Sequence, residues 1–152
     1  MPVEVNQNSI NSQQIEVDVN GPDDVNKMFM ISGQANISLS ASTSPTNQNV
    51  SRDETFKIKL DPHIKNTEFR RSIGNANFSG ISLFDAEDSP ANTFETLNFR
   101  ITDVDADYDD ESEQVELRVS VHLEARGERN SVTTQNIGFN VTTLAAMSDT
   151  TH

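Results

Sequence analysis

Apolar and polar residues alternate strictly along one stretch near the C-terminus of the chain. From Val115 to Ala125 every second residue is apolar, and the residues between them are polar or charged. Because successive side chains of a β-strand point to opposite faces, this pattern predicts a strand with one buried face. A second alternating stretch, 132–141, follows a polar turn that contains Gly127. We expect the two stretches to form one long antiparallel β-hairpin over residues 114–144.

Shorter stretches of the same kind precede this predicted hairpin. They are residues 15–19, 37–41, 56–60, 78–83 and 97–101, and the fourth changes phase at Gly80, as a β-bulge does. The apolar run 28–31 fits either a buried strand or one turn of helix, and the nearby Gly33 favours the strand. Turn-forming residues separate the stretches, and the sequence shows neither a βαβ alternation nor an internal repeat. The pattern therefore predicts an all-β protein, an antiparallel β-sandwich of about eight strands.

The chain has room for one domain of this kind. At 152 residues it is long enough to bury a core, to which β-branched residues and the eight Phe contribute most. Residues 1–13 are mostly Asn, Gln and Ser, so we expect a flexible N-terminal arm, or an arm that becomes ordered only against a neighbour. The single sandwich domain is predicted to span residues 14–145, and a disordered tail, 146–152, follows it.

Composition and charge argue against two classes of partner. The formal net charge of −13 at pH 7 would repel nucleic acids and anionic membranes. The N-terminus has neither the basic nor the apolar segment of a secretory signal, and no apolar run approaches the ~20 residues of a membrane span. We therefore expect a soluble protein with no signal peptide and no transmembrane segment. The chain has no Cys, so cysteine usage indicates no compartment.

Residue types that would carry catalysis are missing or scattered. The chain has no Cys, no Gly-rich phosphate loop and no Gly-x-Ser-x-Gly motif. Its three His stand far apart, at positions 63, 122 and 152, without the spacing of metal ligands. His122 falls on the polar side of its predicted strand, where a cross-strand hydrogen bond is one interpretation and a ligand or proton-transfer role is the other. The sequence predicts that the protein is not an enzyme.

Carboxylates are concentrated in residues 103–113, which hold seven of them in eleven positions. Such a density of oxygen ligands suits Ca²⁺, and Asp103, Asp105 and Asp107 match the first three ligand positions of an EF-hand loop. The match ends there, because Tyr108 stands where that loop turns on Gly and no helix flanks the segment. Two interpretations remain: a Ca²⁺ site, or a solvated acidic loop that discourages edge-to-edge aggregation.

Basic residues are concentrated in residues 54–71, which hold five of the eleven Lys and Arg. One interpretation is an outward strand face that pairs with acidic neighbours. The other is that this basic segment meets the acidic segment 103–113 of a neighbouring subunit. Such a head-to-tail contact predicts a homo-oligomer, most simply a trimer.

The order of elements between residues 55 and 145 carries one family resemblance. It rests on four stretches: Phe56-Lys-Ile-Lys-Leu60 before a proline, Ile81-Ser-Leu83 before a polar loop, Leu97-Asn-Phe-Arg-Ile101, and the closing Ile137-Gly-Phe-Asn-Val-Thr-Thr-Leu-Ala145. In these stretches the chain resembles an H-type lectin domain, a small antiparallel sandwich that assembles into trimers or hexamers and binds sugars like N-acetylgalactosamine. The resemblance implies that Glu124, Arg126 and Arg129 are the nearest counterparts of the sugar-contacting residues. The chain departs from the family in lacking its Trp, since Thr143 precedes the closing Leu-Ala.

Two functional hypotheses follow from the sequence. The first is a non-enzymatic, lectin-like binding module that holds a glycan, with or without Ca²⁺, as a homo-oligomer. The second is a structural or assembly protein, such as a virion or surface component, without a small-molecule ligand. Asn-, Ser- and Thr-rich β chains without Cys and with an unstructured N-terminal arm suit this second role.

Overall fold

The computed structural model describes residues 2–85 and 97–148. Its strands are β1 (Val3–Glu4), β2 (Ile10–Asp18), β3 (Lys27–Ser42), β4 (Asn49–Leu60), β5 (Phe69–Asp85), β6 (Leu97–Asp109), β7 (Gln114–Arg126) and β8 (Asn130–Ala145), with two short 3₁₀ helices, η1 (Gln7–Ser9) and η2 (Pro22–Asp24). Strand residues make up 73% of the structure and helical residues 4%. The prediction of an all-β protein with eight strands is confirmed.

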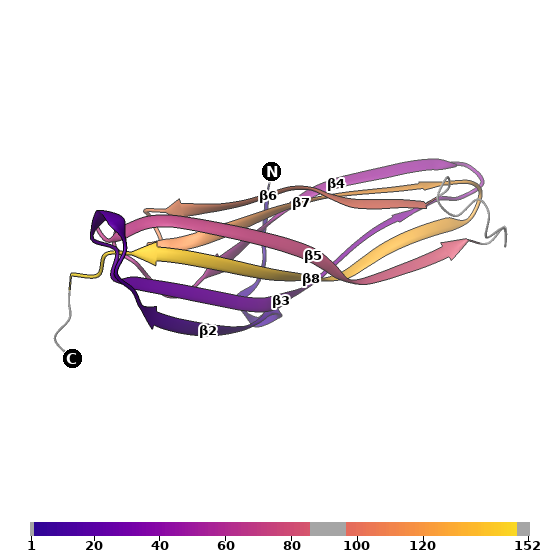
Figure 1. The fold of residues 1–152 in the computed structure, drawn as a ribbon. Helices are drawn as coiled ribbons and strands as arrows, with labels where there is room; N and C mark the ends of the chain where they lie inside the picture. Colours follow the sequence, from indigo (N-terminus) through magenta and orange to yellow (C-terminus); the bar gives the residue numbers. More distant parts are fainter. Residues whose placement is uncertain (1, 86–96, 149–152) are drawn as a thin grey trace.

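The strands form two sheets that stack face to face in an elongated sandwich (Figure 1). Sheet A has the strand order β1-β4-β7-β6, and sheet B has the order β2-β3-β8-β5. Among the described residues, the short pair of β1 and β4 is parallel and the other strand pairs are antiparallel. One end of the sandwich holds the turn between β2 and β3, and we call it the β2–β3 end. The opposite end holds the turn between β7 and β8, and we call it the β7–β8 end.

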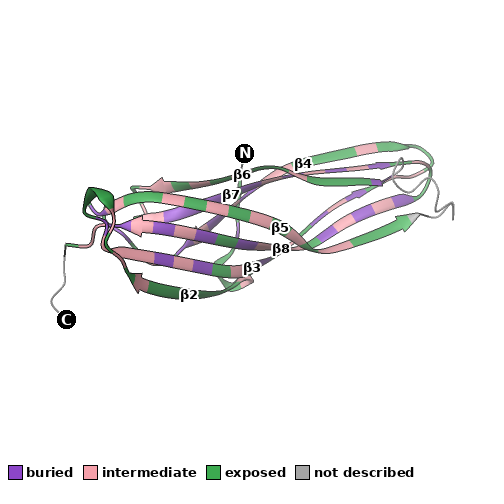
Figure 2. Cartoon of the chain, in the orientation of Figure 1, coloured by how far each residue is buried: buried purple, intermediate pink, exposed green. Residues whose placement is uncertain are grey.

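The centre of the core comes from β7 and β8, the strands with the clearest alternation. The inward residues of β7 are at most 3% exposed: Val115, Leu117, Val119, Val121, Leu123 and Ala125. Facing them from sheet B, Ile137, Phe139 and Val141 are at most 2% exposed. Figure 2 shows the resulting alternation of buried and more exposed residues along β8. Complete burial of one such side chain stabilises the fold by about 1.5–3 kcal/mol.

The predicted C-terminal hairpin is wrong in one respect, because its two strands do not pair with each other. β7 pairs with β4 and β6 in sheet A, whereas β8 pairs with β3 and β5 in sheet B. The turn at Gly127, whose φ is 108°, carries the chain from one sheet to the other. Buried Asn130 anchors this turn, since its backbone N–H donates to the Thr43 hydroxyl at 2.8 Å. Alternation shows that each strand has one buried face, and it does not show whether the two faces share a sheet or meet across the core.

The N-terminal residues predicted to form a flexible arm lie on the sandwich from residue 2 onward. β1 pairs with β4, and the Val5 N–H donates to the Lys57 carbonyl at 2.9 Å. Val5 is 5% exposed and belongs to the core. A few apolar residues in this polar segment therefore suffice to fix it, which average composition does not reveal.

Three further expectations concern β3, the C-terminal tail and the bulge of β5. The apolar run 28–31 lies in β3 and is a strand, with Phe29 and Ile31 buried between the sheets. At the C-terminus, residues 149–152 lie outside the described residues. Ser148 is tied to the domain, because its N–H donates to the Glu68 carboxylate at 2.9 Å. The predicted bulge is confirmed, since the β5–β8 register shifts on both sides of Gly80.

Candidate functional site

The structure places the three carboxylates of the predicted Ca²⁺ loop on a strand. Asp103, Asp105 and Asp107 belong to β6, which continues to Asp109, so the prediction of a loop beginning at residue 103 is wrong. Alternate residues of a strand are roughly 6.5–7 Å apart, whereas ligands of one Ca²⁺ lie about 2.3–2.6 Å from the ion. The three exposed side chains therefore project side by side without converging. Within residues 2–85 and 97–148, no group of three His, Cys, Asp or Glu is placed to hold a metal ion.

The acidic strand has a physical explanation that the sequence already contained. Val104, Ala106 and Tyr108 alternate with the three aspartates and point inward, where they are half-buried. Ala106 is small and Tyr108 carries a polar hydroxyl, so the hydrophobic alternation of this strand is weak. The density of carboxylates was the stronger signal in the sequence. β6 is also the edge of sheet A, and its outward charges discourage pairing with the edge of another sheet.

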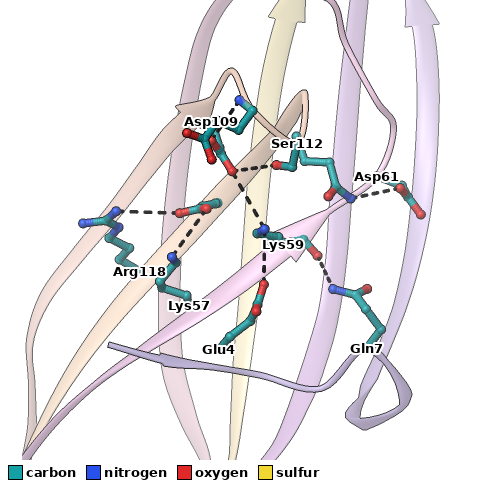
Figure 3. Close-up of polar contacts among 11 residues, drawn as sticks. Glu4, Gln7, Lys57, Lys59, Asp61, Asp109, Ser112 and Arg118 are labelled. Carbon is teal, nitrogen blue, oxygen red and sulfur yellow. Dashed lines mark hydrogen bonds and ion pairs between the residues drawn. The ribbon is translucent and has the colours of Figure 1, made fainter. Parts of the chain in front are cut away.

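The basic strand β4 meets the acidic residues within one chain. β4 and β6 flank β7, so their outward side chains share the outer face of sheet A (Figure 3). The Lys59 ammonium lies 3.2 Å from the Glu4 carboxylate and 3.8 Å from that of Asp109. These contacts are the strand-face pairing that the sequence suggested. They occupy Lys59, one of the five basic residues that the alternative hypothesis assigned to a neighbouring subunit.

Glu116 is the buried acid of this face. Its carboxylate lies 3.7 Å from the Lys57 ammonium and 3.7 Å from the Arg118 guanidinium. The side chain is 6% exposed, so its charge depends on these two cations.

Hydrogen bonds shift the pKa values of two groups near Glu116, the Asp109 carboxyl and the Lys59 ammonium. The Ser112 hydroxyl donates to Asp109 at 2.7 Å, and this bond, with one from the Glu111 N–H, lowers the pKa of the Asp109 carboxyl. The hydrogen bond to Glu4 raises the pKa of Lys59. Both shifts favour the charged forms of Asp109 and Lys59, which lie 3.8 Å apart as mutual partners, and this arrangement suits a stabilising role better than a reactive one.

His122 makes the cross-strand contact that its position suggested. Its Nδ1 lies 2.7 Å from a carboxylate oxygen of Asp53, the residue directly opposite on β4. Its Nε2 lies 3.9 Å from the Glu124 carboxylate. The neighbouring Ser120 hydroxyl is hydrogen-bonded to the Thr55 hydroxyl at 2.8 Å rather than to the imidazole.

The three residues implied by the lectin resemblance are divided between two places. Glu124 and Arg126 lie on the outer face of sheet A, where the Arg126 guanidinium is 2.9 Å from the Glu124 carboxylate. Arg129 lies in the turn at the β7–β8 end and lines a different surface. The structure therefore brings the first two together and separates the third from them.

The surface at Arg129 is an open hollow of about 230 Å³. We call it the Phe84 hollow, and its lining consists of Ser42, Thr43, Phe84, Arg129, Asn130 and Ser131. Three of these residues form a row across sheet B, because Ser131 of β8 lies opposite both Ser42 of β3 and Phe84 of β5. The row faces outward, and the Phe84 residue is 60% exposed.

The polar groups of the Phe84 hollow differ in how they are used. The Thr43 hydroxyl accepts from the Asn130 N–H, so it is already engaged. The hydroxyls of Ser42 and Ser131 have no hydrogen-bond partner among the described residues, and Arg129 has no ion pair there. The hollow therefore offers an aromatic ring, a guanidinium and two hydroxyls to a ligand.

Phe84 was not predicted from the sequence as a residue of the candidate site. Other aromatic side chains in the described part of the chain make more contacts: Tyr108 stacks on Phe69 at 4.5 Å between ring centroids and donates to the Ile64 carbonyl. Phe99 is 38% exposed and packs edge-on against Phe78. The available signal was the phase of β5 after the Gly80 bulge, which places residue 84 on the outward side next to the predicted loop.

Comparison of the chain with protein-family models, with curated proteins and with solved structures found no match. In the described part of the chain, no helix has the length and apolar character needed to cross a membrane.

Proposed function

We propose that the protein is a non-enzymatic, lectin-like binding module that holds a carbohydrate in the Phe84 hollow. The observation that carries the proposal is the grouping of three elements in one hollow: the exposed Phe84, the Arg129 guanidinium, and the hydroxyls of Ser42 and Ser131. Among the described residues, Arg129 has no ion pair and the two hydroxyls have no hydrogen-bond partner. The lectin resemblance implies Arg129 as a site residue. The aromatic surface comes from Phe84 of β5, which was not predicted from the sequence.

The chemistry of a sugar fits these groups. A pyranose ring has an apolar C–H face that packs on an aromatic ring, and its hydroxyls need both donors and acceptors. A guanidinium supplies five N–H donors, and each serine hydroxyl supplies one donor and two acceptor lone pairs. The hollow of about 230 Å³ is smaller than the roughly 300–1,000 Å³ of drug-sized sites. A single sugar ring is the ligand of matching size.

The proposal includes a homo-oligomer, because one small open hollow binds a single sugar weakly and several linked hollows bind a glycan with avidity. A trimer is the simplest form. Lys57 and Lys59 already pair with acids of their own chain, so the subunits would associate through apolar surface. Light scattering at tens of micromolar protein tests this part, and a monomer at both low and moderate salt would refute it.

Glycan arrays with and without Ca²⁺ identify the sugar, and isothermal titration calorimetry then measures its affinity. Phe84→Ala and Arg129→Gln should each weaken binding by at least about tenfold, roughly 1.4 kcal/mol. The matched controls, Phe99→Ala and Arg100→Gln, remove the same groups from sheet A and should leave the affinity unchanged. Absence of binding to any glycan, or equal effects of the test and control variants, would show that the hollow is not a sugar site.

A structural or assembly role is the second candidate, and a different observation favours it. The outer face of sheet B carries large apolar side chains, among them Ile15 at 59% and Ile73 at 68% exposure. Such surface on an elongated sandwich suits packing against other subunits. Concentration-dependent association without glycan binding would favour this candidate over the lectin-like one.

A further inference from the structure

A second hollow is lined by the turn between β2 and β3, whereas the Phe84 hollow is lined by residues next to the turn between β7 and β8. These two turns lie at opposite ends of the sandwich (Figure 1). Its volume is about 270 Å³, and we call it the turn hollow. The turn between β2 and β3, residues 19–26, forms one wall, and the last outward residue of β8 forms the other. The apolar lining consists of Val19, Pro22, Val25 and Leu144.

The turn is held firmly in place over the end of sheet B. The Arg70 guanidinium donates to the carbonyl of Asp23 at 3.1 Å and to that of Thr67 at 2.8 Å. The Asn26 N–H donates to the Ala145 carbonyl at 3.0 Å. Asp23 has a left-handed φ of 59°, which costs on the order of 1 kcal/mol or more for a residue other than glycine. The fold therefore fixes a strained turn in a position where it encloses the hollow.

Apolar surface continues from the turn hollow along the outer face of sheet B. Leu144 lies opposite Met28 of β3 and Arg71 of β5. The next outward row holds Met30 and Ile73, on either side of Thr142. An extended aliphatic group that starts in the hollow can therefore remain on apolar side chains as it leaves.

Arg71 gives the turn hollow its charge. Its side chain is exposed and forms no hydrogen bond or ion pair with a described residue, whereas the adjacent Arg70 is used on backbone carbonyls. Asp23 is the carboxylate in the lining, and it makes no ion pair with Arg71 among the described residues. This guanidinium is therefore available to a ligand at the rim of the hollow.

We propose that the turn hollow binds a carboxylate carried on an aliphatic group. The carboxylate pairs with the Arg71 guanidinium, whose planar fork matches its two oxygens. The aliphatic group fills the space between Val19 and Leu144, and a longer one continues toward Ile73. A free fatty acid and the C-terminus of a peptide ending in a large aliphatic residue share this chemistry. The proposal is independent of the sugar site, which lies at the opposite end of the molecule.

The experiment titrates the full chain with decanoate and follows backbone amide NMR shifts. Shift changes are expected at residues 19–25, 70–73 and 144. Decanol, which keeps the tail without the charge, should bind at least about tenfold more weakly. A second arm uses a short peptide that ends in Leu, with a free carboxylate or as the amide. Binding of decanoate alone identifies a free acid as the ligand, and binding of the peptide acid alone identifies a chain terminus.

Two variants test the two halves of the site. Arg71→Gln should weaken binding of the carboxylate by at least about fivefold and leave decanol unaffected. Arg100→Gln, which removes an exposed arginine from sheet A, is its control and should change neither. Val19→Phe fills the hollow and should weaken both ligands, with the melting temperature confirming that the variant is folded. The proposal fails if neither acid binds, if decanol binds as tightly as decanoate, or if Arg71→Gln and Arg100→Gln have the same effect.

Discussion

The two outer faces of the sandwich use their side chains in opposite ways. On sheet A, acids and bases alternate across neighbouring strands and pair with one another, as Lys57 and Lys59 do with Glu116 and Glu4. On sheet B the outward residues other than Arg71 are mostly apolar, amide or hydroxyl groups, with Ile15 and Ile73 largely exposed. A face whose charges are mutually satisfied gains little by binding, whereas exposed apolar surface gains when it is covered.

Both proposed sites lie on the outer face of sheet B. The Phe84 hollow lies at its β7–β8 end and the turn hollow at its β2–β3 end. Between them runs a row of hydrogen-bonded amides, in which the Asn140 side chain donates to that of Asn75 at 3.4 Å. The contrast between the faces therefore predicts that changes on sheet A alter stability, whereas changes on sheet B alter binding.

The largest effect comes from removing the core on which both faces depend. Val119→Asp places a carboxylate at a position with 0% exposure, where it has no partner. The cost is several kcal/mol against a total stability of roughly 5–15 kcal/mol, so we expect an unfolded chain by circular dichroism. Asn75→Asp introduces a carboxylate on the exposed face of sheet B and should change the free energy of unfolding by less than about 1 kcal/mol. A folded Val119→Asp variant would contradict the core as described.

Glu116→Gln tests whether the charges of sheet A stabilise the fold. The substitution leaves Lys57 and Arg118, which lie directly opposite each other on β4 and β7, without their shared acid. Like charges in that position repel, and we expect a loss of about 1–2 kcal/mol in the free energy of unfolding. Urea denaturation should show a smaller loss at high salt. Asp105→Asn, which removes an exposed acid opposite Arg118, is the control and should cost less than about 0.5 kcal/mol.

Glu68 gives the fold a dependence on pH at the β2–β3 end. Hydrogen bonds from the N–H and hydroxyl of Ser148 lower its pKa. A carboxyl whose pKa is lower in the folded state stabilises it fully above the unfolded pKa of about 4.3, and this contribution is lost as the pH falls through the folded pKa. Glu68→Gln should therefore cost about 1–2 kcal/mol at pH 7 and much less in acid. A loss that is the same at pH 7 and in acid would show that the charge of Glu68 is not responsible.

The sequence predicted the elements of this fold better than their arrangement. Alternation identified β7 and β8, because a half-buried strand repeats every second residue whatever its partners are. Their placement in opposite sheets depends on contacts between residues distant in the chain, which periodicity does not encode. The prediction failed for β6, because Ala106 and Tyr108 give this strand only a weak hydrophobic alternation. Asp103 to Asp107 were therefore predicted to lie in a loop.

The candidate site was predicted less completely than the fold. Arg129 was implied by the resemblance, whereas Phe84 lines the same hollow from β5, and this proximity depends on the pairing of β5 with β8 in the folded chain. The alternating stretches 115–125 and 132–141 were correctly predicted to be strands with one buried face. The pairing of Lys59 with Asp109 inside one chain was one of two interpretations, and the choice required the strand order of sheet A.

The smallest change in stability is expected for a substitution at Ile73, on the outer face of sheet B. Ile73 is 68% exposed, so Ile73→Thr removes little buried surface and keeps a β-branched side chain in the strand. The free energy of unfolding should change by less than about 0.5 kcal/mol. If this face exists for binding, the same variant should weaken self-association measured by sedimentation at high protein concentration, because it removes apolar surface available to a partner. A stability loss above about 1.5 kcal/mol would show that Ile73 stabilises the fold. The outward side chains of both sheets would then contribute to stability, and the contrast between a stabilising face and a binding face would be wrong.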